Sequence, residues 1–303
     1  MSKVKSYIVC GVLPAADEQT FFELEALTLK RASRVSPYKV LSEAKAFEAH
    51  IETMMSGKAY QTAIIEDLAA LGIKADVAVM SATDSRNKAL LICDMDSTLI
   101  GQECIDELAD FAGAGEYVAG ITERAMRGEL DFDAALTERV GLLKGLPLST
   151  LQTCFDQRIT MNKGARILAR TMAANGAKTV IVSGGFTFFS QRVANAAGFD
   201  HNQANILLDD GAVLTGKVKI PILGREAKKA SLETYSADIG GPAAALAIGD
   251  GANDLAMITT AGLGIAYRAK PAVAAAAHCA INHTDLTTAL YFQGYNDSEF
   301  IAD

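Results

Sequence analysis

The fold of this chain is decided by the stretch Ala89-Leu90-Leu91-Ile92-Cys93-Asp94-Met95-Asp96-Ser97-Thr98. Its first five residues form a continuous apolar run, which predicts a buried strand of a parallel sheet. Side chains alternate along a strand, so Asp94 and Asp96 should project to the same side. Open parallel sheets bind their ligands at the carboxyl ends of the strands, which is where these two carboxylates stand.

The carboxylate pair has two interpretations at this point. One is structural: the strand is followed by a polar turn, and the Asp residues cap the next helix. The other is catalytic, because an ionised carboxylate can attack phosphorus without a general base while a neighbouring carboxyl handles the proton of the leaving group. In the catalytic interpretation Asp94 is the nucleophile and Asp96 is the general acid and base.

Composition excludes several classes of protein. The chain has 303 residues, 50% of them hydrophobic and 21% charged, which is ordinary for a soluble globular protein, and the length suggests two domains. A net charge of −8 and a pI near 5.1 argue against a nucleic-acid partner, but not against a small anionic substrate. No apolar run is long enough for a transmembrane helix, so we expect no membrane partner. Five scattered cysteines without a metal-binding pattern fit a reducing, cytoplasmic location.

Residues 1–85 read as a separate α+β domain that ends in the polar segment 81–87. We expect two strands and three helices in it: strands Tyr7–Val12 and Asp76–Met80, and helices Asp17–Ala32, Ser42–His50 and Tyr60–Leu71. Nothing in this domain has a catalytic pattern. Folding support, the contact of a homodimer, and regulation are all left open as its role.

Residues 86–303 read as an α/β domain with a Rossmann-like parallel sheet. Short apolar runs separated by amphipathic helical stretches predict strands covered by helices on both faces. These runs are Ala89–Cys93, Thr179–Val182, Ala244–Ile248, Gly262–Ala266 and His278–Ile281. The interval of about 101–160 reads as helices and is too long for a simple crossover, so we expect a small inserted cap above the carboxyl edge of the sheet. Residues 206–214 carry an Asp-Gly turn between apolar runs, which predicts a β-hairpin.

Further polar motifs follow two of these predicted strands. Ser183-Gly184-Gly185 could be a phosphate cradle or a simple Gly-rich turn. Gly249-Asp250-Gly251-Ala252-Asn253-Asp254 would bring more carboxylates toward Asp94, and such crowding calls for a cation, for which Mg²⁺ is the expected ion. Asp94, the Asp96 carbonyl and Asp250 are then the predicted metal ligands, with Asp254 supporting them from outside and Asn253 touching substrate.

A lysine pair, Lys228-Lys229, opens a predicted helix between these motifs. Most such pairs are merely exposed. We favour Lys228 as the ammonium group beside the transferring phosphoryl group, with Lys229 in solvent. The order D-x-D-S-T, S-G-G, K, G-D-G-x-N-D resembles the haloacid-dehalogenase (HAD) superfamily of phosphotransferases over roughly residues 88–285, and more narrowly the phosphoserine phosphatase family.

The narrower resemblance rests on Asp94–Ile100 with Glu103, on Val182–Phe186, and on cap segments 121–128 and 142–147. It implies a HAD core with an inserted cap, an ACT-like N-terminal domain, and the final, Mg²⁺-dependent step of serine biosynthesis. Arg139 and Glu103 would bind the carboxylate and ammonium of the small-molecule substrate O-phosphoserine, and Met126 and Phe132 would wall the site. Singly, these four residues could equally be ordinary helix or cap-core positions.

Three alternatives to hydrolysis of O-phosphoserine stay open. The chain could pass the phosphoryl group to another alcohol such as homoserine, or hydrolyse another small phosphate ester. It could also be a receiver-like module that uses a phosphorylated Asp94 as a switch. Asp96 and the cap argue against a switch, because a switch needs neither an acid/base group nor a lid.

Overall fold

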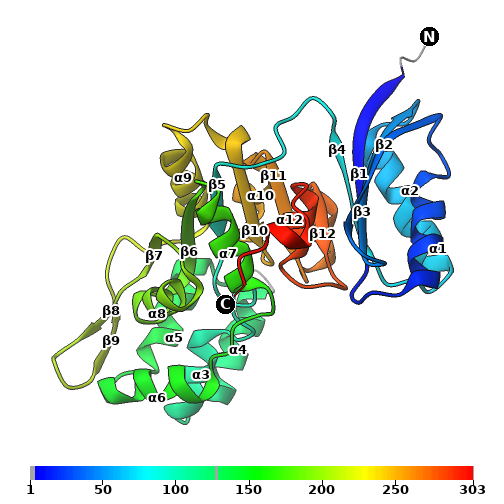
Figure 1. Ribbon diagram of the computed structural model, residues 1–303. Coiled ribbons are helices and arrows are strands. Elements are labelled where there is room, and N and C mark those ends of the chain that lie inside the picture. Colours follow the sequence, from blue (N-terminus) through cyan, green and yellow to red (C-terminus); the bar gives the residue numbers. More distant parts are fainter. Residues whose placement is uncertain (1–3, 127–128, 303) are drawn as a thin grey trace.

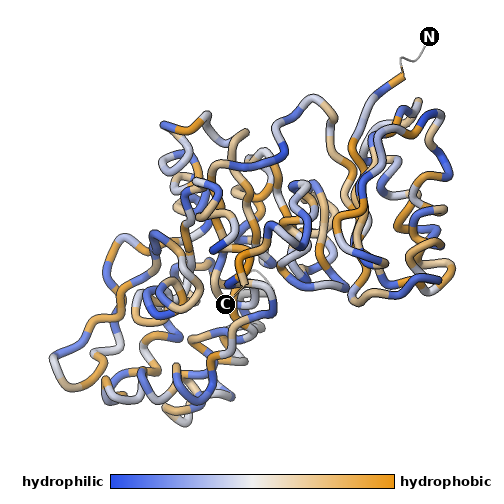
Figure 2. The backbone as a smooth tube through the Cα atoms, in the orientation of Figure 1, coloured by the Kyte–Doolittle hydropathy of each residue, from blue (hydrophilic) through white to orange (hydrophobic). Residues whose placement is uncertain are grey.

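The computed structural model describes residues 4–126 and 129–302, without the side chains of residues 119, 123, 125 and 126. Figure 1 shows three parts: an N-terminal domain at one side, a central core with its own sheet, and a helical cap at the far end. Figure 2 shows hydrophobic residues concentrated along the strands of both sheets, as expected for strands that are buried between helices.

The N-terminal domain is a four-stranded antiparallel sheet with strand order β2-β3-β1-β4. Its elements in chain order are β1 (Lys5–Val12), α1 (Glu18–Leu29), β2 (Arg34–Ser42), β3 (Ala46–Thr53), α2 (Gly57–Ala70) and β4 (Asp76–Ser81). This β-α-β-β-α-β order agrees with the expected ACT-like α+β domain. Phe21, Leu24, Tyr60 and Ile64 of the two helices pack on one face of the sheet.

One predicted helix in this domain is wrong. Residues 42–50 form the end of β2, a turn with Ala44 at φ 50°, and most of β3. The buried side chains Phe47, Ala49 and Ile51 alternate with half-buried ones, which is the two-residue period of a strand with one face on a core. The lysine, alanine and glutamate content of the segment favoured a helix, but pairing with β1 along its whole length decides the outcome.

The core is a six-stranded sheet of order β12-β11-β10-β5-β6-β7, and all its pairs are parallel. The strands are β5 (Leu90–Cys93), β6 (Lys178–Phe186), β7 (His201–Asn205), β10 (Ala245–Gly249), β11 (Leu263–Tyr267) and β12 (Cys279–Ile281). The predicted parallel sheet is confirmed, and β7 is an edge strand that the sequence did not reveal. Because β5 lies between β6 and β10, the three motif-bearing strands are neighbours.

Helices cover both faces of this sheet. Leu91 and Cys93 of β5 belong to the apolar cluster on one face, and Leu90 and Ile92 belong to the cluster on the other. The helices are α7 (Ala165–Ala174), α8 (Thr187–Ala197), α9 (Arg225–Ser236), α10 (Leu255–Thr260), α11 (Pro271–Ala276) and α12 (Thr288–Phe292). Burial of successive β5 residues on opposite faces explains why this strand is a continuous apolar run. Among the described residues, none of the helices is both long and apolar enough to cross a membrane.

The cap follows β5 and contains the expected helices. They are α3 (Cys104–Phe111), α4 (Gly115–Met126), α5 (Phe132–Gly141) and α6 (Leu148–Arg158). The expected hairpin also forms, from β8 (Leu207–Asp209) and β9 (Leu214–Val218). It joins the cap through backbone hydrogen bonds between Leu214 and both Gly145 and Leu146, so the cap draws on two distant parts of the sequence (Figure 1).

The N-terminal domain is fastened to the core by apolar and polar contacts. Cys10, Val12 and Leu41 belong to the same apolar cluster as the core helices α7 and α12. The buried Asp76 carboxylate, at the start of β4, accepts hydrogen bonds from the backbone N–H groups of residues 282–284 and from the Thr284 hydroxyl. Arg86, in the linker, pairs with Glu48. These contacts hold β4 next to β12.

Candidate active site

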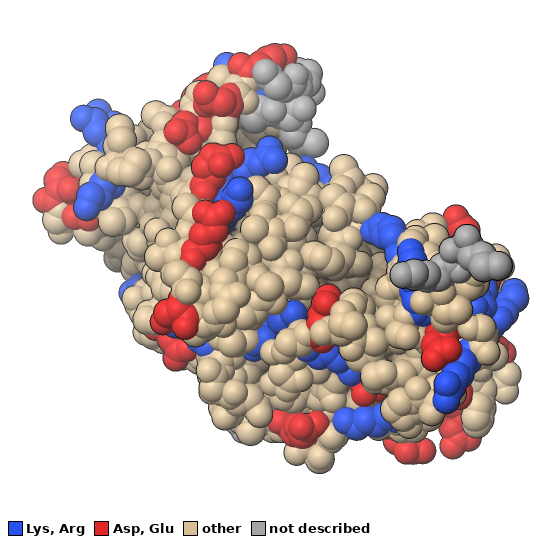
Figure 3. Space-filling view, turned by 90° about the horizontal axis from the view of Figure 1, so that it is seen from above, with Lys and Arg blue, Asp and Glu red and all other residues tan. Residues whose placement is uncertain are grey.

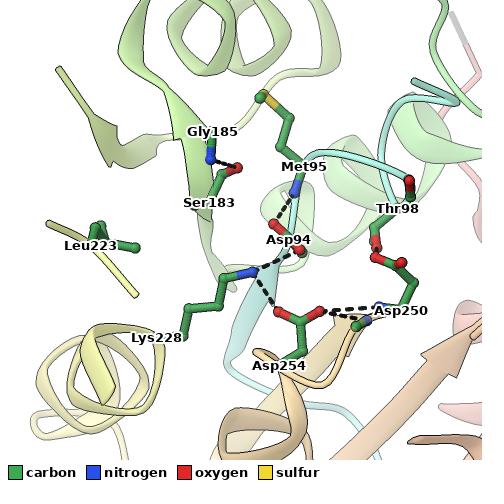
Figure 4. A network of polar contacts seen from close by, with 12 residues as sticks. Asp94, Met95, Thr98, Ser183, Gly185, Leu223, Lys228, Asp250 and Asp254 are labelled. Carbon is green, nitrogen blue, oxygen red and sulfur yellow. Dashed lines mark hydrogen bonds and ion pairs between the residues drawn. The ribbon is translucent and has the colours of Figure 1, made fainter. Parts of the chain in front are cut away.

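Three neighbouring strands end at one cavity. Asp94 follows β5, Ser183 lies near the end of β6, and Asp250 follows β10, so the three predicted motifs meet at the carboxyl edge of the core sheet (Figure 4). The point where strand order reverses between β10, β5 and β6 is where open α/β sheets bind ligands. The site therefore has the position that the opening stretch of sequence predicts.

Asp94 is held at the centre of this edge. One carboxylate oxygen accepts a hydrogen bond from the Met95 backbone N–H at 2.7 Å, and the other lies 2.7 Å from Lys228 Nζ. Burial raises the pKa of Asp94 well above its ordinary value; the nearby Asp254 carboxylate adds to this, and Lys228 opposes it. A fixed, 4% exposed carboxylate that faces the cavity suits a nucleophile aimed at one position.

Lys228 connects two carboxylates. It reaches up from α9 with a fully buried side chain, and its Nζ lies 2.7 Å from Asp94 and 2.5 Å from Asp254. Burial opposes its charge, but the two carboxylates more than offset this, so its pKa is above the ordinary value and the ammonium stays charged. Lys229 instead lies on the helix surface, near Glu233. The structure thus places Lys228 and not Lys229 beside Asp94.

The Asp254 carboxylate is fully engaged by the protein. One oxygen accepts a hydrogen bond from Lys228, and the other accepts from the backbone N–H groups of Asp250 and Gly251 at 3.2 and 3.0 Å. A hypothetical Cβ on Gly249 would lie 2.4 Å from this carboxylate, so glycine is required there. These contacts agree with a residue that orients Lys228 and the Asp250 turn.

The carboxylates form a group that could hold a cation. One oxygen from each of Asp94, Asp250 and Asp254 lies within 4.8 Å of the others. Burial raises the pKa of Asp250 to about 6, Asp254 adds to the rise, and a 3.0 Å hydrogen bond from Thr98 opposes it. Crowded carboxylates and carbonyls are the hard oxygen ligands that Mg²⁺ prefers, and a divalent cation would relieve their repulsion. The donor set therefore fits the predicted ion.

Asp96 is buried beside Asp94 and faces the same cavity. A Cβ on Gly185 would lie 2.5 Å from Asp96 Oδ2, while Oδ1 has no hydrogen-bond partner among the described residues. Burial raises the pKa of Asp96 to about 7; Glu103 adds to the rise, and a hydrogen bond involving Cys104 opposes it. A carboxyl group that titrates near neutrality can both donate and accept a proton, which is what general acid and base catalysis needs.

The cap closes the other side of a cavity of about 480 Å³. Phe132 begins α5, and its ring packs on the glycine turn, since a Cβ on Gly184 would lie 3.0 Å from Phe132 Cζ. Ser97, at φ 55°, turns the chain so that its hydroxyl donates to Glu103 at 2.7 Å. Among the residues that line this cavity are most of the predicted ones: Asp94, Asp96, Glu103, Phe132, Arg139, Ser183, Gly184, Asp250 and Asn253.

Two side chains of opposite charge, Glu103 and Arg139, line the cavity. Glu103 precedes α3, and Arg139 lies in the last turn of α5, where its Nε donates to the Ala135 carbonyl. Burial raises the pKa of Glu103, whereas the Ser97 hydrogen bond and the Arg139 charge oppose the rise. Glu103 and Arg139 thus line the same cavity, together with Asp106 of α3, whose charge adds to the rise in the pKa of Glu103. The side chain of Met126, at the end of α4, lies outside the described residues.

The structure also adds residues that the sequence did not indicate. Thr98 orients Asp250 through its hydroxyl, and Lys270, the residue before α11, is another residue that lines the cavity. Thr98 belongs to the opening motif, so its hydroxyl was a usable signal. Lys270 stands in an Arg-Ala-Lys-Pro turn after β11, and nothing in its local sequence distinguishes it from a surface lysine.

Comparison with known proteins agrees with this fold and site. A family model described as haloacid dehalogenase-like hydrolase matches residues 91–259, which is more than half of the chain. The chain belongs to the haloacid dehalogenase-like hydrolases. Within them it is similar to phosphoserine phosphatases: that of Streptococcus thermophilus is 48% identical over 203 residues, covering 67% of this chain and 94% of that protein.

Two solved structures extend the likeness over nearly the whole chain. A HAD family hydrolase from Salmonella enterica serovar Typhi has a TM-score of 0.83 at 30% identity and covers 95% of this chain and 98% of its own. A probable phosphoserine phosphatase from Vibrio cholerae has a TM-score of 0.75 at 31% identity and covers 96% and 86%. The prediction of a HAD enzyme related to phosphoserine phosphatases is thus confirmed.

Proposed function

We propose that this enzyme hydrolyses O-phospho-L-serine to L-serine and phosphate, through an aspartyl-phosphate on Asp94. The observation that carries the proposal is the shared cavity, because Asp94, Asp96, Glu103 and Arg139 all line it. A phosphate ester that carries both a carboxylate and an ammonium matches this arrangement. The chain's similarity to phosphoserine phosphatases supports the same substrate.

The substrate would bind by its three charged groups. Arg139 would hold the carboxylate and Glu103 the ammonium, both through charge-assisted hydrogen bonds. Ser183, Gly184, Lys228 and Asn253 would surround the phosphoryl oxygens. Phe132 would exclude water above the glycine turn, with Met126 as a further predicted wall. Dry surroundings strengthen each of these electrostatic contacts.

The reaction then has two displacements at phosphorus. In the first, an Asp94 oxygen forms a bond to phosphorus, the bond from phosphorus to the serine oxygen breaks, and Asp96 gives that oxygen its proton. In the second, Asp96 takes a proton from water, the water oxygen attacks phosphorus, and the bond to Asp94 breaks. Asp94 is thus regenerated, and Asp96 ends the second step protonated, as it began the first.

Mg²⁺ is the proposed cofactor. Asp94, Asp250 and the Asp96 carbonyl would hold it, and Asp254 would support them from outside the ligand sphere. When bound, the ion neutralises charge on the phosphoryl oxygens and the crowded carboxylates. The final step of serine biosynthesis is the proposed place of the reaction, and a cytoplasmic location and a homodimer stay predictions.

The test is phosphate release from O-phospho-L-serine with Mg²⁺ and after chelation, beside phosphothreonine and an aryl phosphate. We expect Mg²⁺-dependent turnover that is selective for phosphoserine. Adding homoserine and analysing the products distinguishes hydrolysis from transfer to another alcohol. Turnover of the aryl phosphate alone would discard the substrate, and no multiple turnover of any ester would leave the switch module as the better explanation.

A further inference from the structure

A second cavity, of about 370 Å³, lies between the N-terminal domain and the core. Its walls are the first turns of α2, the strand β4, the linker to β5, the start of β11 and the segment between α11 and β12. Lys88 stands two residues before β5, and His278 stands directly before β12. The cavity is therefore at the amino edge of the parallel sheet, opposite the edge that carries Asp94 and Asp250.

Besides Arg86, which pairs with Glu48, three basic side chains line this cavity: Lys58 from α2, and Lys88 and His278 from the core side. The Lys58 ammonium donates to the carbonyl oxygens of Ala275 and Ala277 at 3.0 and 3.3 Å. The Lys88 ammonium donates to those of Ser85 and Ala243 at 2.6 and 3.1 Å. An ammonium group has three N–H donors, so each of the two lysines keeps one donor for another partner.

Neither ammonium is neutralised by the protein. In residues 4–126 and 129–302, no carboxylate lies within ion-pair distance of Lys58 or Lys88. Lys88 is only 7% exposed, and burial of an unpaired ammonium is costly. Burial lowers the pKa of Lys88, and also that of His278, which Lys88 and Lys58 lower further. The His278 Nδ1 accepts a hydrogen bond from the Gly264 N–H at 3.0 Å, so this ring is neutral and offers its other nitrogen as a donor. The charge surplus of the cavity therefore comes from the two ammonium groups.

The other charged residues of the wall do not balance this surplus. Arg86 is already paired with Glu48 and donates to the Phe292 carbonyl at 3.0 Å. Asp84 is the single carboxylate among the described lining residues; it is exposed on the linker, and its charge partly opposes the lowering of the pKa values of Lys88 and His278. Figure 3 looks onto this side of the molecule and shows basic side chains, with an acidic one beside them, gathered where the two lobes meet.

We propose that the cavity binds a small organic anion between the N-terminal domain and the core. Its carboxylate or phosphate group lies among the three basic side chains. Its apolar body packs on the apolar part of the wall, which is formed by Ala78, Met80, Leu263 and Ala276. A volume of this size is at the small end of the range for small-molecule sites. Because Lys58 belongs to the N-terminal domain and Lys88 to the core side, the anion would contact both parts of the protein.

The test uses two fluorinated probes on the full chain: monofluorophosphate for a phosphate group and 4,4,4-trifluorobutyrate for a carboxylate with an apolar body. Their ¹⁹F NMR lines should broaden on binding. Lys58→Gln and Lys88→Met should each weaken binding by about tenfold, the value of one charge-assisted hydrogen bond. Lys58 is exposed, so Lys58→Gln should fold normally even if Lys88→Met does not.

Lys74→Gln is the matched control, because Lys74 is an exposed lysine of the same domain that does not line the cavity. The two variants also separate this cavity from the site beside Asp94, because neither Lys58 nor Lys74 lines that site. Broadening that is lost in Lys58→Gln but not in Lys74→Gln supports the proposal, and the probe that shows it identifies the anionic group. Absence of broadening with both probes, or broadening that Lys58→Gln leaves unchanged, overturns it. Turnover is not measured, so the result is independent of the proposed function.

Discussion

The two edges of the core sheet carry opposite excess charge. At the carboxyl edge, Asp94, Asp250 and Asp254 crowd around a single buried ammonium, that of Lys228. At the amino edge, Lys58 and Lys88 line a cavity, and the hydrogen bonds that their ammonium groups make within the described part of the chain go to carbonyl oxygens. Both edges leave polar groups and space where strands end. The sign of the unbalanced charge differs, and it indicates a cation at one edge and an anion at the other.

The largest expected effect tests whether the chemistry belongs to the carboxyl edge alone. Asp94→Asn removes the proposed nucleophile, so phosphate release from phosphoserine should fall by roughly 10⁴-fold or more. The fold should persist, because asparagine keeps the shape and Lys228 keeps its contact with Asp254. The measurement is steady-state turnover with a thermal melt of the same sample. Lys58→Gln, at the opposite edge, is the control and should change turnover less than about twofold. Retained turnover in Asp94→Asn would contradict the assignment of Asp94 as the nucleophile.

Chelation tests whether a cation is bound at the carboxyl edge of the core sheet. Chelation should lower turnover by about 10³-fold, since the ion stabilises charge at phosphorus, and added Mg²⁺ should restore it. Asp250→Asn should require more Mg²⁺ for the same rate, because Asp250 is a proposed ligand. The readout is the Mg²⁺ titration of turnover for the two proteins. Full activity in chelator would contradict a cation at this edge.

Substrate selectivity should depend on the cap wall of the same cavity. Arg139→Ala should lower kcat/KM for phosphoserine by about 100-fold, because a charge-assisted contact to the carboxylate is lost. An aryl phosphate without a carboxylate should be affected less than about threefold. Arg124→Ala is the matched control, since Arg124 pairs with Glu138 on the cap. Equal losses for both esters would show that Arg139 supports the cap and does not bind the substrate carboxylate.

The smallest expected effect is a pH-dependent change in stability at the carboxyl edge. The pKa of Asp96 is about 7 in the folded state and 3.8 ordinarily, so the folded protein without metal holds this proton more tightly. Protonation of Asp96 therefore adds to the free energy of unfolding. This contribution is fully present below about pH 4 and is lost as the pH rises through about 7. Asp96→Asn should raise the Tm of the chelated protein by several degrees at pH 8 and by much less at pH 4.5. An equal shift at both pH values would mean that the carboxyl charge is not the cause.

The core of the fold could be predicted because its signals are local. Ala89–Cys93 and Ala244–Ile248 are continuous apolar runs, and each ends in a motif with its own chemistry. A parallel sheet then brings those motifs to one edge without further information. In the same way, burial of Leu90 and Leu91 on opposite faces follows from the apolar run itself.

Other parts could not be predicted, because they depend on contacts between distant segments. β7 (His201–Asn205) has a polar sequence and is a strand only because it pairs with β6 at the sheet edge. Residues 46–50 carried helix-forming residues and became a strand by pairing with β1. The hairpin of β8 and β9 was expected, but its place in the cap was not. The basic cavity combines residues more than 200 positions apart along the chain, such as Lys58 and His278.

The contact between β4 and β12 has a consequence for solubility. β12 is the last strand of the core sheet, and an open last strand presents unpaired N–H and C=O groups that can recruit a strand of another molecule. Here Gln61 donates to the His278 carbonyl beside β12, and Asp76 accepts the N–H groups just after it. The N-terminal domain thus covers the β12 edge of the core sheet, and we expect it to hinder strand pairing with another molecule at that edge.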